Sequence, residues 1–143
     1  MHFSRTALFA ALGASATGAA AQPDAWELLR GVTAEEVMTD TSYTVRKSFP
    51  AAFSSTIPAF QITGYAVPMQ YGEATRDIML VSDMGFCPYC GDPAHGVALQ
   101  VTLAEPMTFA DDSTRLQLRG TLLRVDDPET FQAAVLNDAE VLR

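Results

Sequence analysis

Basic residues are scarce in this sequence, and their scarcity argues against one class of partner. Nine lysines and arginines stand against 17 aspartates and glutamates, which gives a net charge of -8. A nucleic-acid-binding domain needs a basic surface to replace the counterions of the phosphates, so nucleic acid is not an expected partner. Long hydrophobic runs are also absent. No run approaches the roughly 18–20 apolar residues of a membrane helix, so no membrane span is expected in the mature chain.

The sequence motifs of the common enzyme classes are missing as well. There is no G-x-S-x-G nucleophile elbow, no P-loop and no dinucleotide-binding fingerprint. The paired acids Asp111–Asp112 and Asp126–Asp127 are explained better by turns and caps than by catalysis. The sequence therefore offers no catalytic residue and favours a non-enzymatic protein.

Apolar residues are plentiful, at 48% of the chain, which excludes a disordered protein. Residues 1–21 have the features of a secretory signal peptide. Arg5 supplies the positive charge, an apolar stretch begins at Ala7, and small residues precede a cleavage site between Ala21 and Gln22. Twin arginines and a lipoprotein cysteine are absent, so we expect a bacterial protein that is periplasmic or secreted.

Removal of the signal peptide leaves 122 of the 143 residues as one domain, 22–143, with a net charge of -9. Period-two alternation of apolar residues predicts strands over much of this domain. The predicted strands cover residues 43–49, 60–67, 77–81, 97–103 and 116–122, with a closing edge strand at 141–142. Within them, Gly64 indicates a bulge or a tight bend.

Short helices are predicted at the margins of these strands. Thr33-Ala34-Glu35-Glu36 fits a capping box at a helix start, after a short turn around Trp26. Asp127 and Pro128 predict the start of a last helix that ends near Asn137. Five or six short strands with flanking helices indicate a mainly β fold, a small and partly open OB-like barrel.

The chemistry of the sequence concentrates in one loop, between the predicted strands 77–81 and 97–103. Cys87 and Cys90 are the two cysteines of the chain, and His95 is the one histidine of the predicted mature protein. The Cys-x2-Cys spacing lets two thiolates on a turn converge on one ion. Zinc accepts such a Cys2His set with a fourth position open, for which Asp92 is a candidate ligand. Copper(I) also fits, because it selects soft sulfur donors, and Met84 could contribute one.

Two other interpretations of the same loop stay open. A Cys87–Cys90 disulfide could shape the loop in an oxidising compartment, although closing so small a ring stabilises little. Cys-Pro-Tyr-Cys also resembles the active-site tetrapeptide of glutaredoxins, over these four residues only. In that family the first cysteine begins a helix that stabilises its thiolate. Gly91 and Pro93 argue against such a helix here, and with it against a thiol–disulfide oxidoreductase.

The segment from Ile62 to Val101 resembles the exported bacterial proteins grouped as domain of unknown function 3299. The resemblance is carried by Ile62-x-Gly64-Tyr65-x-Val67-Pro68, by the apolar strand Met79-Leu80-Val81, and by the Cys- and Pro-rich loop with the valine-rich strand after it. It covers about 40 of the 122 mature residues. It implies a periplasmic protein without an established enzyme activity. Because some relatives are thought to accompany transporters and metal-uptake systems, it also implies a transporter or another periplasmic protein as partner.

Overall fold

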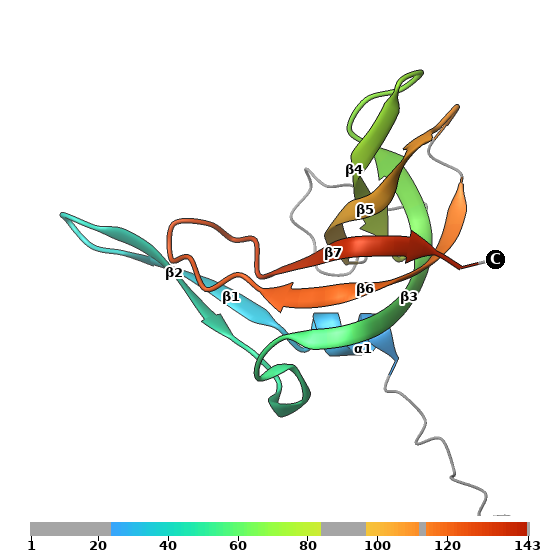
Figure 1. The fold of residues 1–143 in the computed structure, drawn as a ribbon. Helices are drawn as coiled ribbons and strands as arrows, with labels where there is room; N and C mark the ends of the chain where they lie inside the picture. Colours follow the sequence, from blue (N-terminus) through green and yellow to red (C-terminus); the bar gives the residue numbers. More distant parts are fainter. Residues whose placement is uncertain (1–23, 84–96, 112–113, 143) are drawn as a thin grey trace, which may run out of the picture.

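The computed structural model describes residues 24–83, 97–111 and 114–142, and the fold is given for these residues (Figure 1). Its elements are α1 (Ala25–Arg30), β1 (Thr33–Met38), β2 (Tyr43–Ser48), a 3-10 turn (Ala51–Phe53), β3 (Ile57–Pro68), β4 (Ala74–Val81), β5 (Ala98–Thr108), β6 (Arg115–Arg124) and β7 (Ala134–Val141). No helix in this part of the chain is long and apolar enough to cross a membrane. The predicted signal peptide and its cleavage site lie outside these residues.

Strands β3 to β7 close into a five-stranded barrel in the order β3-β4-β5-β7-β6, and β6 returns to β3. Neighbouring strands are antiparallel except β5 and β7, which are parallel. This order, with the third and fifth barrel strands parallel, is the OB-type connectivity, so the predicted mainly β barrel is confirmed. The barrel is closed rather than partly open, because the 12-residue β3 is long enough to pair with both β4 and β6.

The barrel core is built from alternate residues of each strand, as the period of two requires. Its fully buried side chains include Ile78, Leu80, Leu99, Val101, Leu103, Leu118, Leu122 and Leu136. The predicted strands 77–81 and 116–122 fall within β4 and β6, and the predicted strand 97–103 begins one residue before β5; together they supply most of this set. The apolar periodicity of the sequence therefore locates the core correctly.

Helix α1 packs against β3 at one end of the barrel. The indole Nε1 of Trp26 donates a hydrogen bond of 2.7 Å to the carbonyl of Thr63. Gly64 makes this approach possible, since a Cβ there would lie 2.8 Å from Trp26 Cζ2 and 2.7 Å from the Val81 carbonyl oxygen. The register with β6 runs through Gly64 without a shift, so the predicted bulge is absent at this position. Gly64 serves close packing instead.

The predicted helix at Thr33-Ala34-Glu35-Glu36 is wrong. These residues begin β1, which pairs along its whole length with β2, from Thr33↔Ser48 to Met38↔Tyr43. The capping box is a local preference, whereas the hairpin gains cross-strand hydrogen bonds and a turn closed by Thr39 N–H donating to the Ser42 carbonyl at 2.8 Å. Figure 1 shows this hairpin extending away from the barrel as an arm.

The predicted helix from Asp127 to Asn137 is also wrong. The Asp127 carboxylate does accept from a backbone N–H two residues on, that of Glu129 at 2.9 Å, but it forms a turn and no helix follows. The chain then enters β7, which fills the gap between β5 and β6. Of the predicted edge strand at 141–142, Val141 is the last residue of this internal strand and Leu142 lies just beyond it. Closure of the barrel therefore overrides the local helix signal.

Candidate functional site

The loop that carries the predicted metal ligands leaves and re-enters the fold at one end of the β4–β5 hairpin. Val81 pairs with Ala98 in the last register position. Beyond this pair, the Ser82 N–H donates to the Val97 carbonyl at 3.1 Å, and the Val97 N–H donates to Ser82 Oγ at 3.2 Å. These bonds hold the two ends of the connection together on a strand pair that is buried in the core.

The predicted ligands themselves, Met84, Cys87, Cys90, Asp92 and His95, lie outside the described residues. In the sequence they stand between Asp83, the last described residue after β4, and Val97, the first described residue before β5.

No alternative metal centre is present in residues 24–83, 97–111 and 114–142. They contain no group of three or more histidine, cysteine, aspartate or glutamate residues placed to hold an ion. Met107 packs against the core, whereas Met69 is 68% exposed. The donor set predicted from the sequence has no competitor in the described fold.

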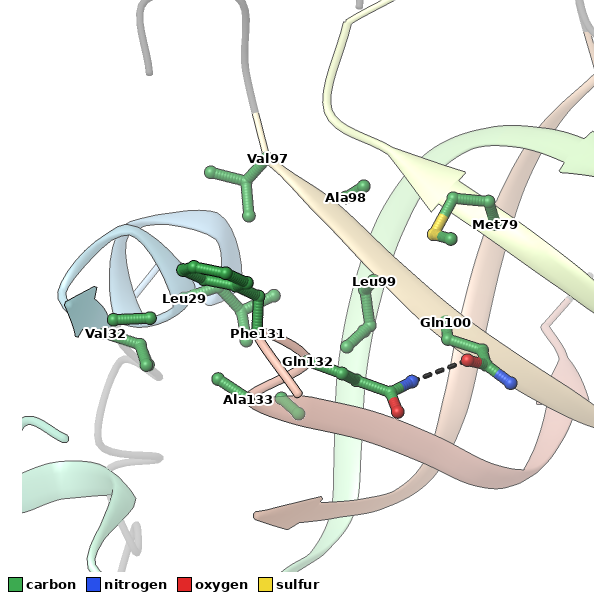
Figure 2. Close-up of a pocket in the computed structure, with 12 residues that line it drawn as sticks. Leu29, Val32, Met79, Val97, Ala98, Leu99, Gln100, Phe131, Gln132 and Ala133 are labelled. Carbon is green, nitrogen blue, oxygen red and sulfur yellow. Dashed lines mark hydrogen bonds between the residues drawn. The ribbon is translucent and has the colours of Figure 1, made fainter. Parts of the chain in front are cut away.

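An apolar pocket of about 450 Å³ opens beside the start of β5, where the chain enters the strand at Val97 (Figure 2). Its walls come from α1, the start of β1, β4, the start of β5 and the connection before β7. The lining residues are Leu29, Val32, Ala34, Met79, Val97, Ala98, Leu99, Gln100, Phe131, Gln132, Ala133 and Ala134. These segments are far apart in the sequence, and the periodicity of single strands gave no signal for the pocket.

The polar groups of this pocket are a pair of side-chain amides. Gln132 Nε2 donates to Gln100 Oε1 at 2.5 Å (Figure 2). This bond leaves Gln132 Oε1 as an acceptor and Gln100 Nε2 as a donor. Phe131, 52% exposed, presents its ring at the pocket. None of the lining side chains is ionisable, so the pocket offers apolar contact and amide hydrogen bonds rather than acid–base chemistry.

Lys47 holds one wall of the pocket in place. Its ammonium group donates to three backbone carbonyls of the β6–β7 connection, those of Val125 at 2.8 Å, Asp127 at 2.8 Å and Gln132 at 2.6 Å. The neighbouring Val45 N–H donates to Pro128 O at 2.7 Å. The sequence predicted that Lys47 lies in the strand 43–49 and indicated no function for this side chain. Its position on the apolar side of that strand, with Tyr43, Val45 and Phe49, is the signal that could have identified it.

Comparisons of the chain with protein-family models, with curated proteins and with solved structures find no match. The resemblance to domain of unknown function 3299 therefore stays a prediction.

Proposed function

We propose that this chain is an exported, non-enzymatic β-barrel domain that binds a soft or borderline metal ion, zinc or copper, through Cys87, Cys90 and His95. In this proposal it holds or hands over the ion for a periplasmic transport system. One observation carries the proposal. Every cysteine of the chain, and the one histidine of the predicted mature protein, fall within nine consecutive residues.

The anchoring of the loop supports this proposal energetically. A ligand set in a connection with fixed ends samples fewer conformations than the same set in a free chain, so less entropy is lost when the ion binds. The Ser82–Val97 hydrogen bonds provide such fixed ends. Two thiolates also neutralise the charge of Zn²⁺, and the neutral imidazole completes three ligands with a fourth position for Asp92 or water. For copper(I), Met84 is the additional soft donor.

Native mass spectrometry tests the proposal directly. The protein is purified from the periplasm without chelator or reductant and weighed under native conditions and again after acidification. We expect one retained ion that is lost in acid and leaves two free thiols. Cys87→Ser, Cys90→Ser and His95→Gln should each weaken binding of the added ion by at least about tenfold, because the loss of even an outer-shell partner of a ligand lowers metal affinity about 10–100-fold.

The matched control is Met69→Leu, because Met69 is an exposed sulfur outside the loop. This variant should bind the ion as the wild type does. Unchanged affinity in all three ligand variants would refute the metal site. A metal-free protein two hydrogens lighter than the reduced chain, which binds no ion after reduction, would favour the Cys87–Cys90 disulfide as a loop staple. Thiol–disulfide exchange activity that vanishes in Cys87→Ser would favour the oxidoreductase.

A further inference from the structure

The outer edge of β1 is without a strand partner in the described fold. In the β1–β2 pair, the Val45 N–H points away from β1 to Pro128 O, so Val45 and Glu36 form a pair without mutual hydrogen bonds. By the alternation of an antiparallel ladder, the N–H and C=O groups of Ala34, Glu36 and Met38 then point outward. No backbone partner for them exists among residues 24–83, 97–111 and 114–142. An unpaired edge of this kind is a template for another strand.

The apolar pocket begins where this edge begins. Ala34 lines the pocket, and Ala34, Glu36 and Met38 share one face of β1. In an added strand, the side chain opposite Ala34 would lie beside the pocket. The side chains opposite Glu36 and Met38 would lie on the same face, at the next two alternate positions. The free donor and acceptor of the Gln100–Gln132 pair are available to a peptide group in the pocket.

The charges on the outer edge of β1 favour an added strand with a basic residue. Glu36 is exposed and has no ion-pair partner in the described chain, while Glu35 lies across from Arg46. Lys47, the other cation of the β1–β2 hairpin, already donates hydrogen bonds to three carbonyls of the β6–β7 connection. A basic side chain opposite Glu36 therefore adds a favourable cross-strand pair, and an acidic one adds repulsion.

A second copy of this chain fits the edge poorly. In an antiparallel β1–β1 pairing about a two-fold axis, residues with outward N–H and C=O groups pair with one another, so the register that pairs Ala34 with Met38 sets Glu36 opposite Glu36 of the other copy. Like charges directly opposite one another destabilise a ladder, and both copies carry a strong net negative charge. The edge is suited to a different chain.

We propose that β1 and the adjacent pocket bind an extended, basic segment of a partner protein by strand addition. The segment has an apolar residue for the pocket, a lysine or arginine two positions further, and an apolar residue two positions beyond that, against Met38, which is 70% exposed. Main-chain hydrogen bonds supply affinity, and the alternate side chains supply specificity. The inference stands apart from the metal proposal, because it uses only residues of the described fold.

Fluorescence anisotropy with synthetic peptides tests this inference. The probe is the labelled heptapeptide Thr-Leu-Thr-Lys-Thr-Leu-Thr with blocked termini, titrated with the full mature protein. We expect saturable binding that weakens at least about tenfold when the lysine is replaced by glutamate in the peptide, or when the protein carries Glu36→Lys. Glu105→Lys is the matched control, because Glu105 is an exposed acid on β5 outside the pocket, and it should change affinity less than about twofold.

Strand addition is distinguished from charge attraction by backbone methylation. N-methyl groups on one alternate set of peptide residues should abolish binding, and on the other set they should not, because only one set faces β1. Glu36→Pro, which removes an outward N–H, should block binding, and Glu36→Gln provides a milder variant that keeps the strand intact. Equal effects of both methylated sets, or unchanged affinity in Glu36→Gln and Glu36→Lys, would overturn the proposal. So would a dimer in sedimentation that disappears in Glu36→Pro.

Discussion

Lys47 illustrates how one polar side chain can fix the position of a whole connection. Its ammonium group is the common donor to Val125 O, Asp127 O and Gln132 O, which lie in a segment without helix or strand. Each carbonyl would otherwise need another donor or water. The side chain thereby joins the β1–β2 hairpin to the pocket wall that carries Phe131 and Gln132.

We predict that Lys47→Met lowers the free energy of unfolding by roughly 2 kcal/mol, because hydrogen bonds to a charged group are lost while the aliphatic stem is kept. Urea denaturation followed by circular dichroism measures this change. Arg46→Met is the matched control. Arg46 is the neighbouring exposed residue on the opposite face of β2, and its loss should cost less than about 0.5 kcal/mol. Equal costs in the two variants would show that the three carbonyls do not depend on Lys47.

Gly64 gives a second prediction at the residue scale. A Cβ at this position would lie under 3.0 Å from the Val81 carbonyl oxygen, from Trp26 Cζ2 and from Leu80 Cγ. Gly64→Ala should therefore destabilise the protein by about 2–3 kcal/mol through overpacking, and it should shift the emission of Trp26, the single tryptophan. Gly72→Ala is the comparison. Gly72 has φ +78° and open space around it, so only backbone strain of about 1 kcal/mol is expected, with Trp26 emission unchanged.

At the scale of elements, the sequence predicted the strands whose side chains are buried on one face, and it missed the strands that are decided by pairing with a distant part of the chain. The strands that form β4, β5 and β6 were predicted because their apolar residues alternate, and burial on one face requires that pattern. β1 has mostly exposed residues and no such pattern, so its capping-box motif was the stronger local signal. β7 was missed because the turn chemistry at Asp127 resembles a helix cap. In both cases, pairing with a strand elsewhere in the sequence decided the outcome.

The turn of the β1–β2 hairpin gives the prediction at this scale. Thr39 Oγ1 accepts from the Ser42 N–H at 3.0 Å and lies 2.6 Å from Ser42 Oγ, so its hydroxyl organises the turn that favours a hairpin over a helix. Thr39→Val should speed amide hydrogen exchange at Glu35 and Val37, whose N–H groups face β2, by about fivefold, which corresponds to roughly 1 kcal/mol. Exchange in the barrel strands should not change. Thr41→Val, in the same turn, is the control, and a similar effect there would contradict the assigned role of Thr39.

At the scale of the whole molecule, the barrel was predictable and the surface around the candidate site was not. The number of short apolar strands in the sequence is enough to indicate a small barrel. The pocket beside Val97 combines residues from both ends of the chain, such as Leu29 and Ala134, and only the closed topology brings them together. The loop with the two cysteines was found from the sequence because thiol and imidazole chemistry can be recognised without a fold.

The relation between the barrel and the loop leads to a prediction about metal and folding. The described residues form a continuous core, with Leu80 of β4 and Leu99 of β5 packed in it next to the loop ends. Unlike a zinc finger, which unfolds without its ion, the metal-free protein should therefore keep the circular dichroism spectrum of the loaded protein. An ion that binds only the folded state should still add about 2.7 kcal/mol to stability at a free concentration one hundred times its Kd.

Urea titrations with and without added zinc measure both effects, and the Cys87→Ser Cys90→Ser double variant is the control that should unfold at one midpoint under both conditions. A metal-free protein that lacks β structure would contradict the independence of the barrel from the loop. A barrel that stays folded, yet gains the same stability from zinc in the double variant, would place the ion elsewhere. The two results separate the stability of the barrel core from the proposed binding of the ion by the loop.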